Sequence, residues 1–133
     1  MASFQLEIVT PQRLVYRGEV EGLRAPGALG GFGVLARHIP FLTSLGPGEI
    51  IIREAEGSRF LATSGGFVEV LRAGVTVLAE TAEFAEEIDK DRAEQARERA
   101  RARFKQRDAK IDIARAEAAL ARAIHRLRVI QRL

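Results

Sequence analysis

The residues with the clearest chemical potential are arginines near the C-terminus of the 133-residue chain. They form two trios with the same offsets of seven and four residues: Arg92, Arg99 and Arg103, and Arg115, Arg122 and Arg126. We call them the first and second arginine rows, because at about 100° per residue each trio follows one line of an α-helix. Guanidinium forks match phosphate and carboxylate oxygens, and neighbouring guanidinium groups repel one another unless an anion lies between them. The rows therefore predict an anion site wherever they come together.

The region that must position these rows, residues 87–133, has the composition of helix. All 12 glycines and all 4 prolines lie before residue 75, and alanine, arginine and glutamate dominate the C-terminal region. Asp89 is expected to cap a first helix and Asp108 a second, after a bend at residues 106–108. Because that bend has no glycine or proline, a continuous helix is also sterically allowed. We therefore expect an arm that exists both folded back as a hairpin and extended.

Apolar stripes decide how the two helices face each other. The second helix has a stripe with heptad spacing: Ala109, Ile113, Ala116, Leu120, Ala123, Leu127 and Ile130. The first has a thinner stripe of mostly small residues: Ala93, Ala96, Ala100 and Phe104. Small side chains bury little area, which predicts weak pairing. Each arginine row lies roughly 100° from its stripe in the same rotational sense, so an antiparallel hairpin would bring both rows beside one groove.

Several interpretations of these rows remain open. An anion site would take either a nucleoside triphosphate or an acidic helix of a partner protein. The spacing is equally typical of solvated arginines stabilised by local acids such as Glu94, Glu98 and Asp112. Nucleic acid is disfavoured, because Phe104 is the tail's one aromatic residue and acids interrupt the basic charge. The alternative function is a free-standing basic helical adaptor that binds nucleic acid or an acidic partner helix.

Residues 1–86 have the pattern of an all-β sandwich. Short apolar runs recur at roughly 8 to 12 residue intervals, and several alternate at period two. Among about eight to ten strands, we expect residues 4–8, 14–16, 20–25, 50–53, 60–63, 67–71 and 75–79. Glycines at 65–66 separate two of these strands, and the glycine-rich stretch 30–33 is expected to be a turn. The predicted fold is α+β, with a sandwich domain at 1–86 followed by an antiparallel two-helix arm at 87–133.

Charge divides the chain at the same place. Residues 1–86 carry 7 arginines and no lysine against 10 acids, whereas residues 87–133 carry 14 basic residues against 8 acids. Only the tail is basic. The absence of cysteine excludes disulfides and thiolate metal sites. No apolar run reaches the roughly 20 residues of a membrane span, and the N-terminus lacks a signal-peptide layout, so we expect a soluble, intracellular chain without direct membrane insertion.

Catalysis is not expected from this composition. The chain has two histidines, His38 and His125. Ser64 lacks the spacing of a nucleophile elbow, because residue 62 is alanine. The stretch 30–33 lacks the Lys-Ser/Thr ending of a phosphate-binding loop, and no long helix fits before Pro40. Little converges on one pocket, so the sequence predicts a non-catalytic protein without a metal site.

Three motifs, in order, resemble the epsilon subunit of F-type ATP synthases. Residues 63–70, Thr-Ser-Gly-Gly-Phe-Val-Glu-Val, resemble the central signature of that family. Residues 33–35, Gly-Val-Leu, and 38–40, His-Ile-Pro, resemble its bottom loop. Residues 88–93, Ile-Asp-Lys-Asp-Arg-Ala, resemble the motif with which some bacterial members bind ATP. The resemblance extends from Phe4 to the C-terminus and includes the change from sandwich to helical hairpin.

This resemblance implies a regulatory part in rotary catalysis. The family's epsilon subunit belongs to the central stalk, where the sandwich packs against the gamma subunit and the c-ring, on the cytoplasmic face of the bacterial plasma membrane. Folded down, the arm permits turnover; extended along gamma, it meets the alpha and beta subunits and inhibits ATP hydrolysis. In nucleotide-binding members ATP holds the hairpin down, which requires that ATP bind the folded state more tightly.

The resemblance also implies site residues. The ATP site would comprise Glu83, Ile88, Asp89, Arg92, Ala93, Arg99, Arg122 and Arg126. The Asp89 carboxylate and the helix start would meet the adenine edge, and the guanidinium forks the phosphates. Partner contacts are expected at Phe32, His38, Arg103 and Arg115. Gly31 stands where many members carry an acid and Ala36 where most carry proline, so the c-ring contact is expected to depend on Phe32, His38 and backbone groups.

Overall fold

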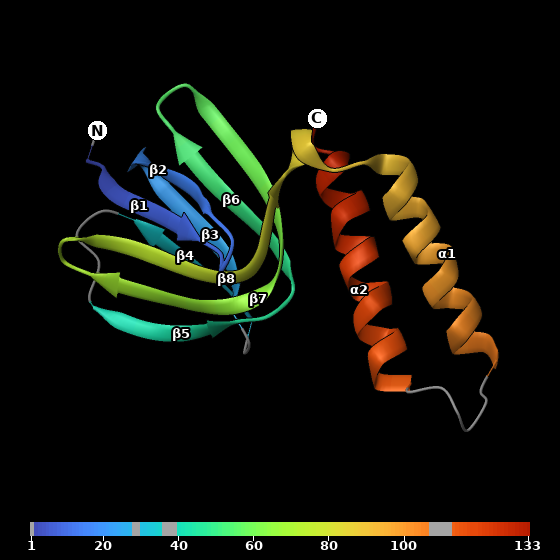
Figure 1. Cartoon of the computed structure of the whole chain (residues 1–133). Coiled ribbons are helices and arrows are strands. Elements are labelled where there is room, and N and C mark those ends of the chain that lie inside the picture. Colours follow the sequence, from blue (N-terminus) through green and yellow to red (C-terminus); the bar gives the residue numbers. More distant parts are fainter. Residues whose placement is uncertain (1, 28–29, 36–39, 107–112) are drawn as a thin grey trace.

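The computed structural model of the chain describes residues 2–27, 30–35, 40–106 and 113–133. Within them, eight strands form a β-sandwich and two helices form an arm beside it (Figure 1). The strands are β1 (Phe4–Val9), β2 (Leu14–Val20), β3 (Gly22–Gly27), β4 (Gly30–Leu35), β5 (Phe41–Leu45), β6 (Gly48–Glu54), β7 (Gly57–Leu71) and β8 (Gly74–Phe84). A short 3-10 helix, η1 (Ala85–Glu87), leads into α1 (Lys90–Gln106) and α2 (Ile113–Ile130). The predicted fold class is confirmed.

Strand β7 links the two halves of the sandwich. The strand order is β2-β1-β8-β7-β5-β3-β4, and β6 pairs with both β3 and β7. The first half of β7 pairs with β6 and the second half with β5, while β8 runs antiparallel along most of its length. Strands β1 and β8 are parallel. One strand of 15 residues therefore contributes to surfaces on both sides of the fold.

The glycine pair in β7 is a bulge inside this strand. The expectation that it separates two strands, 60–63 and 67–71, was wrong. The register with β8 shifts on both sides of Gly65, and the φ angles of Gly65 and Gly66 are +129° and +144°. Glycine adopts such positive φ angles without a steric cost, so the ladder continues through the pair.

The bulge changes which residues of β7 point into the core. Before it, Leu61 and Thr63 are buried within the sandwich; after it, the buried positions are Val68 and Val70. The inward positions thus change from odd to even numbers. Because side chains alternate along a strand, this change turns Phe67 to the outer face.

Two further strands lie where the sequence predicted none. Residues 30–33, expected to be a turn, belong to β4, which pairs along its whole length with β3. Strand β5 pairs with β7 from Phe41↔Val70 to Leu45↔Gly66. Backbone groups form these ladders, so a segment can extend against a partner strand whatever its side chains.

The core follows the alternation of the strands. In β1, Phe4, Leu6 and Ile8 are buried and their neighbours are half-buried, as predicted. The largest fully buried side chains of the sandwich are Leu6, Ile8, Ile50, Ile52, Leu61, Val20, Val34, Val68, Val70, Val75 and Val77. Full burial of each such side chain contributes roughly 1.5–3 kcal/mol. The sandwich is therefore a well-packed platform for the surfaces described below.

The outer face of the sheet carries a line of apolar side chains. Cross-strand pairing aligns one residue from each of four neighbouring strands: Phe67, Leu78, Val9 and Leu14. We call this line the apolar row. Phe67 is 54% exposed and Leu78 is 50% exposed. Contiguous exposed apolar side chains are typical of a contact surface for another protein, since their exposure to water is unfavourable.

Tyr16 is expected to make the sandwich sensitive to alkali. Its hydroxyl donates to Glu54 Oε2 at 2.8 Å, and burial first, then this carboxylate, raise its pKa from 10.0 to about 12. Because the folded state has the higher pKa, the stabilisation is complete below pH 10 and is lost between pH 10 and about 12. Over that window the wild type should lose up to about 3 kcal/mol of unfolding free energy relative to Tyr16→Phe. Urea unfolding across these pH values measures the difference, and an identical pH dependence in both proteins would contradict the prediction.

Candidate functional site

The arm begins at Asp89, as predicted. The backbone N–H of Arg92 donates to Asp89 Oδ1 at 3.1 Å, and that of Ala93 donates to the Asp89 carbonyl at 3.0 Å. The first bond satisfies one of the free N–H groups at the helix start. Asp91 adds negative charge in the first turn, where the helix dipole favours it. The second predicted cap, Asp108, lies outside the described residues.

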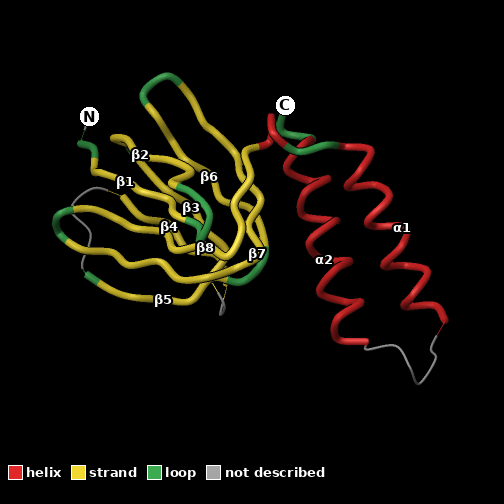
Figure 2. Tube along the Cα trace, viewed as in Figure 1, coloured by secondary structure: helices red, strands yellow, loops and turns green. Residues whose placement is uncertain are grey.

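Helices α1 and α2 form the predicted antiparallel hairpin. Figure 2 shows them side by side, with α2 nearer the sandwich. Their contact is made by buried alanines: Ala93, Ala100, Ala116 and Ala123. Alanines bring helices close but each buries little area, so the weak pairing expected from the sequence stays a prediction. Ile113, expected in the stripe of α2, is instead 51% exposed and is the first residue of that helix. Ala109, from the same stripe, lies outside the described residues.

The second arginine row faces the sandwich at its C-terminal end. Arg126 Nε donates to Glu83 Oε1 at 2.8 Å, and its Nη2 lies 2.7 Å from the same oxygen. Arg122 and Arg126 line a hollow whose other walls are Ala62, Thr63, Ser64, Thr81 and Glu83. The space is about 10 Å³, which suits roughly one water molecule. Three predicted ATP residues therefore meet here, around a space far smaller than a nucleotide. Arg115, at the other end of the row, is exposed.

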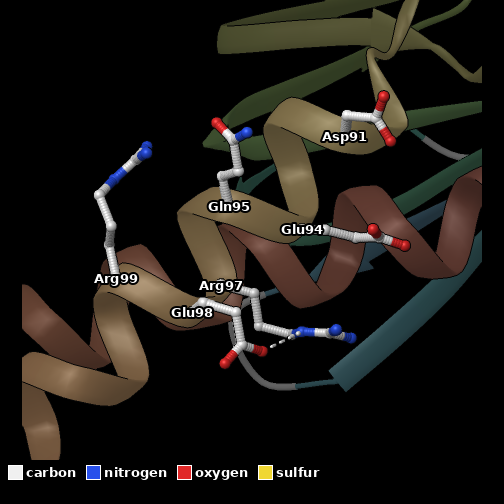
Figure 3. A pocket seen from close by; sticks show the side chains of 6 residues that line it. All are labelled: Asp91, Glu94, Gln95, Arg97, Glu98 and Arg99. Atoms are coloured by element: carbon white, nitrogen blue, oxygen red, sulfur yellow. Dashed lines mark ion pairs between the residues drawn. The ribbon is translucent and has the colours of Figure 1, made fainter.

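Arg99, from the first row, lies beside a different hollow. This hollow is wide and open, about 540 Å³, and follows α1; it is lined by Asp91, Glu94, Gln95, Arg97, Glu98 and Arg99 (Figure 3). In Figure 3 the Arg99 side chain extends away from Glu98, which pairs with Arg97 instead. The Arg97 Nε is 3.4 Å from Glu98 Oε1 and, although buried, makes no hydrogen bond within the described residues. Three carboxylates line this hollow and would repel a polyphosphate, so it is not an anion site by itself.

The other predicted residues of α1 and its junction have mixed surroundings. Arg92 and Arg103 are exposed. Ala93 is buried in the helix contact. Ile88 is half-buried and packs against the cluster around Val129. Ile88 and Ala93 therefore build the hairpin and its junction, whereas the exposed arginines remain accessible to a ligand.

Phe32 is the best defined of the predicted partner contacts. It lies on β4, half-buried, and its ring meets that of Phe41 edge to face with 5.9 Å between centroids. Gly31 is exposed on the same strand. His38 and Ala36 lie outside the described residues. Phe32 and the exposed Phe41 thus present aromatic surface near the predicted bottom loop.

A second contact between arm and sandwich was not predicted. Val129 is 0% exposed and packs against Ala62 and Ala85. Arg132 donates to both carboxylate oxygens of Glu49, from Nε at 3.1 Å and from Nη2 at 2.9 Å. One feature of the sequence could have indicated this contact: Val129 is the only apolar residue of the last turn of α2 outside the heptad stripe. Such a residue indicates a second buried face.

His125, also near this contact, is half-buried on α2. Burial first, then the charge of Arg128, lower its pKa, while Glu49 opposes the change. The imidazole is therefore neutral at pH 7. Within the described residues there is no group of three side chains suited to hold a metal ion, and no helix long and apolar enough to cross a bilayer.

Comparison with known proteins accounts for both parts of the chain. The family model of the β-sandwich domain of the ATP synthase delta/epsilon chain matches residues 3–85, and that of its long α-helix domain matches residues 86–131. A relative named ATP synthase epsilon chain, from Nitratidesulfovibrio vulgaris (strain DP4), is 50% identical over 96% of this chain and 95% of its own. A protein of the same name from Moorella thermoacetica is 48% identical over 96% of each.

Solved structures agree with these matches. In the Euglena gracilis mitochondrial ATP synthase, a cryo-EM structure of OSCP, F1 and c-ring, one chain superposes with a TM-score of 0.80 and 27% identity, covering 91% of this chain and 77% of that one. A chain of the Tetrahymena thermophila mitochondrial ATP synthase central stalk and c-ring has a TM-score of 0.56 at 15% identity, covering 98% and 96%, and supports the fold alone. The resemblance inferred from the three motifs is confirmed.

Proposed function

Since the chain belongs to the ATP synthase delta/epsilon family, as an epsilon subunit of the bacterial F-type enzyme, we propose that it couples rotation and regulates ATP hydrolysis through its helical arm. The subunit is a non-catalytic part of the central stalk. Family membership disfavours a free-standing adaptor that binds nucleic acid. The proposed location is peripheral, at the cytoplasmic face of the bacterial plasma membrane.

The apolar row is the proposed docking surface for the gamma subunit. It crosses four strands of the sheet, and two of its neighbouring members, Phe67 and Leu78, are about half exposed. A partner that covers this row removes apolar surface from water without reorganising the sandwich. For the c-ring, the proposed contact is at Phe32 and the predicted bottom loop with His38, where Phe41 and Leu42 add exposed apolar surface.

A single charge in the apolar row tests this docking. We expect Leu78→Glu to weaken co-purification with cognate gamma by at least about tenfold, because a carboxylate would be buried without a partner. Ile113→Glu is the matched control, since it places the same charge at an equally exposed apolar residue of the arm. It should leave gamma binding unchanged. Failure of the wild type to co-purify with gamma would contradict the proposed function as a whole.

The regulatory switch is proposed to be the arm itself. Folded as a hairpin it permits turnover; extended along gamma, its basic residues meet acidic surfaces of the alpha and beta subunits. The alanine contact between α1 and α2 supports this proposal, because little apolar area opposes separation of the helices. Arg103 and Arg115 are exposed, as a contact with alpha and beta requires.

ATP is the proposed ligand that favours the folded hairpin. Arg122 and Arg126 line the hollow beside Glu83, whereas Arg99 lines a separate hollow along α1, so ATP would have to bring the two arginine rows together. Asp89 uses Oδ1 for its cap and retains Oδ2 for a ligand. Arg126 is already paired with the Glu83 carboxylate, and the hollow beside this pair has room for one water molecule. ATP would therefore have to displace Glu83 from Arg126 and widen the hollow. ATP stabilises the folded hairpin only if it binds the folded arm more tightly than the extended arm.

A further inference from the structure

Three residues on neighbouring strands form a row beneath the end of α2. Ala62 on β7 pairs with Glu49 on β6 and with Glu83 on β8. Directly paired residues point to the same face of a sheet, so a small side chain lies between two carboxylates. We call this set the acid–alanine–acid row. It lies before the β7 bulge, so it occupies the even-numbered outer position there.

The end of the arm carries a matching set at intervals of three residues. Arg126 binds Glu83 at 2.7 Å, Val129 packs on Ala62, and Arg132 binds both oxygens of Glu49. Each helical residue of the set thus meets one residue of the row. The turn beyond α2 continues the helix to Arg132, whose N–H donates to the Val129 carbonyl at 3.0 Å.

The two spacings agree for a geometric reason. Neighbouring strands lie about 4.8 Å apart. Three residues of an α-helix rise about 4.5 Å. A helix laid across the strands therefore keeps register with one row of a sheet over three strands. The long arginine side chains compensate for the rotation of about 60° between successive members of the set.

The centre of this contact is apolar and enclosed. Val129 is 0% exposed, with Ala62, Ala85, Phe60 and Ile88 around it. The Arg132 guanidinium also lies over the Phe60 ring, 5.2 Å from its centroid. A larger residue at position 62 would occupy the space that Val129 fills. Only 16% of the Glu49 side chain is exposed, so the pair with Arg132 is better shielded than an ordinary surface ion pair.

We propose that the acid–alanine–acid row is the docking surface for residues 126–132 of the arm, and that the helix-to-strand match sets the register and lifetime of the docked hairpin. That this docking controls inhibition rests on the proposed function; the docking itself does not. The last turn of α2 is accordingly the latch of the arm.

A thiol in place of Val129 measures how often the latch opens. The chain has no cysteine, so Val129→Cys introduces a single thiol of nearly the same shape that reacts only when α2 leaves the row. In this background, Arg132→Glu should raise the labelling rate with a thiol reagent by about tenfold, because an ion pair becomes a like-charge pair. A nearby carboxylate slows thiolate formation, so faster labelling reports opening and not reactivity. Adding Glu49→Arg to Arg132→Glu should restore the slow rate.

Two controls make the result decisive. Arg128→Glu makes the same charge change in the same turn, at an exposed residue for which the described structure has no carboxylate partner, and should leave the rate within about twofold. Val77→Cys places a thiol in the sandwich core, where its rate should not respond to Arg132→Glu unless the whole fold opens. Equal rates for Arg132→Glu and Arg128→Glu, or no recovery in the charge-swapped protein, would overturn the proposal. If the labelling rates follow the expected pattern but the wild type fails to bind gamma, the result would contradict the proposed function alone.

Discussion

Gly66→Ala is expected to destabilise the sandwich by at least about 2 kcal/mol more than Gly57→Ala. Both glycines have nearly the same backbone angle, with φ of +144° and +142°, so an alanine at either site bears a similar conformational strain. Their surroundings differ. A Cβ at Gly66 would overlap the carbonyl oxygen of Leu78 and lie 2.9 Å from the Ala79 Cα, whereas nothing lies within 4 Å of a Cβ at Gly57.

Urea unfolding of the two variants separates the cost of backbone strain from the cost of steric overlap with the added methyl group. Gly57→Ala should lose only the strain, about 1–3 kcal/mol. Gly66→Ala must also move β8 away from β7, which disturbs the bulge that turns Phe67 outward. It should therefore lose gamma binding along with stability. Equal losses of stability in the two variants would show that the backbone can move to accommodate the methyl group.

Arg122→Ala combined with Arg126→Ala is expected to lower the affinity of the isolated chain for ATP by at least about 100-fold. A hydrogen bond to a charged group contributes about 1.5–3 kcal/mol, and two such contacts to phosphate would be removed. Titration calorimetry with ATP measures the loss. Absence of heat with the wild type at millimolar ATP would end the nucleotide proposal.

Removal of Arg126 has a second consequence, because it leaves Glu83 without its ion pair. Arg122→Ala alone avoids this problem, since the pair between Arg126 and Glu83 remains. We expect the single variant to lose about tenfold in affinity. The control for the double variant is Arg101→Ala with Arg128→Ala, which also removes two positive charges but from exposed positions outside both rows. If this control weakened ATP binding as much as the Arg122→Ala, Arg126→Ala variant, general electrostatic attraction and not a defined site would explain the loss.

Features with local causes could be predicted from the sequence. The cap at Asp89, the glycine-free helices and the alternation in β1 each depend on residues a few positions apart. Helix period and strand period carry such information directly. The alanine stripes likewise identified the contact between α1 and α2, with Ile113 as the exception at the helix end.

Strand β7 and its partners could not be predicted in the same way. Gly65 and Gly66 are as typical of a turn as of a bulge, and the difference depends on how this segment pairs with β5 and β8. Strand β4 is extended because β3 lies beside it. Pairing with partner strands satisfies the backbone groups of these segments, and their side chains give little sign of it.

The sequence by itself determined the fold class, the hairpin, the family resemblance and the two lines of arginines, since each is written in neighbouring residues. Only the tertiary structure decided where those lines point. A helical period says which residues share a line, but the direction of that line is set by what the helix packs against. Here Val129 on Ala62 turns Arg126 toward Glu83 and Arg132 toward Glu49, three contacts between residues that lie 43 to 83 positions apart.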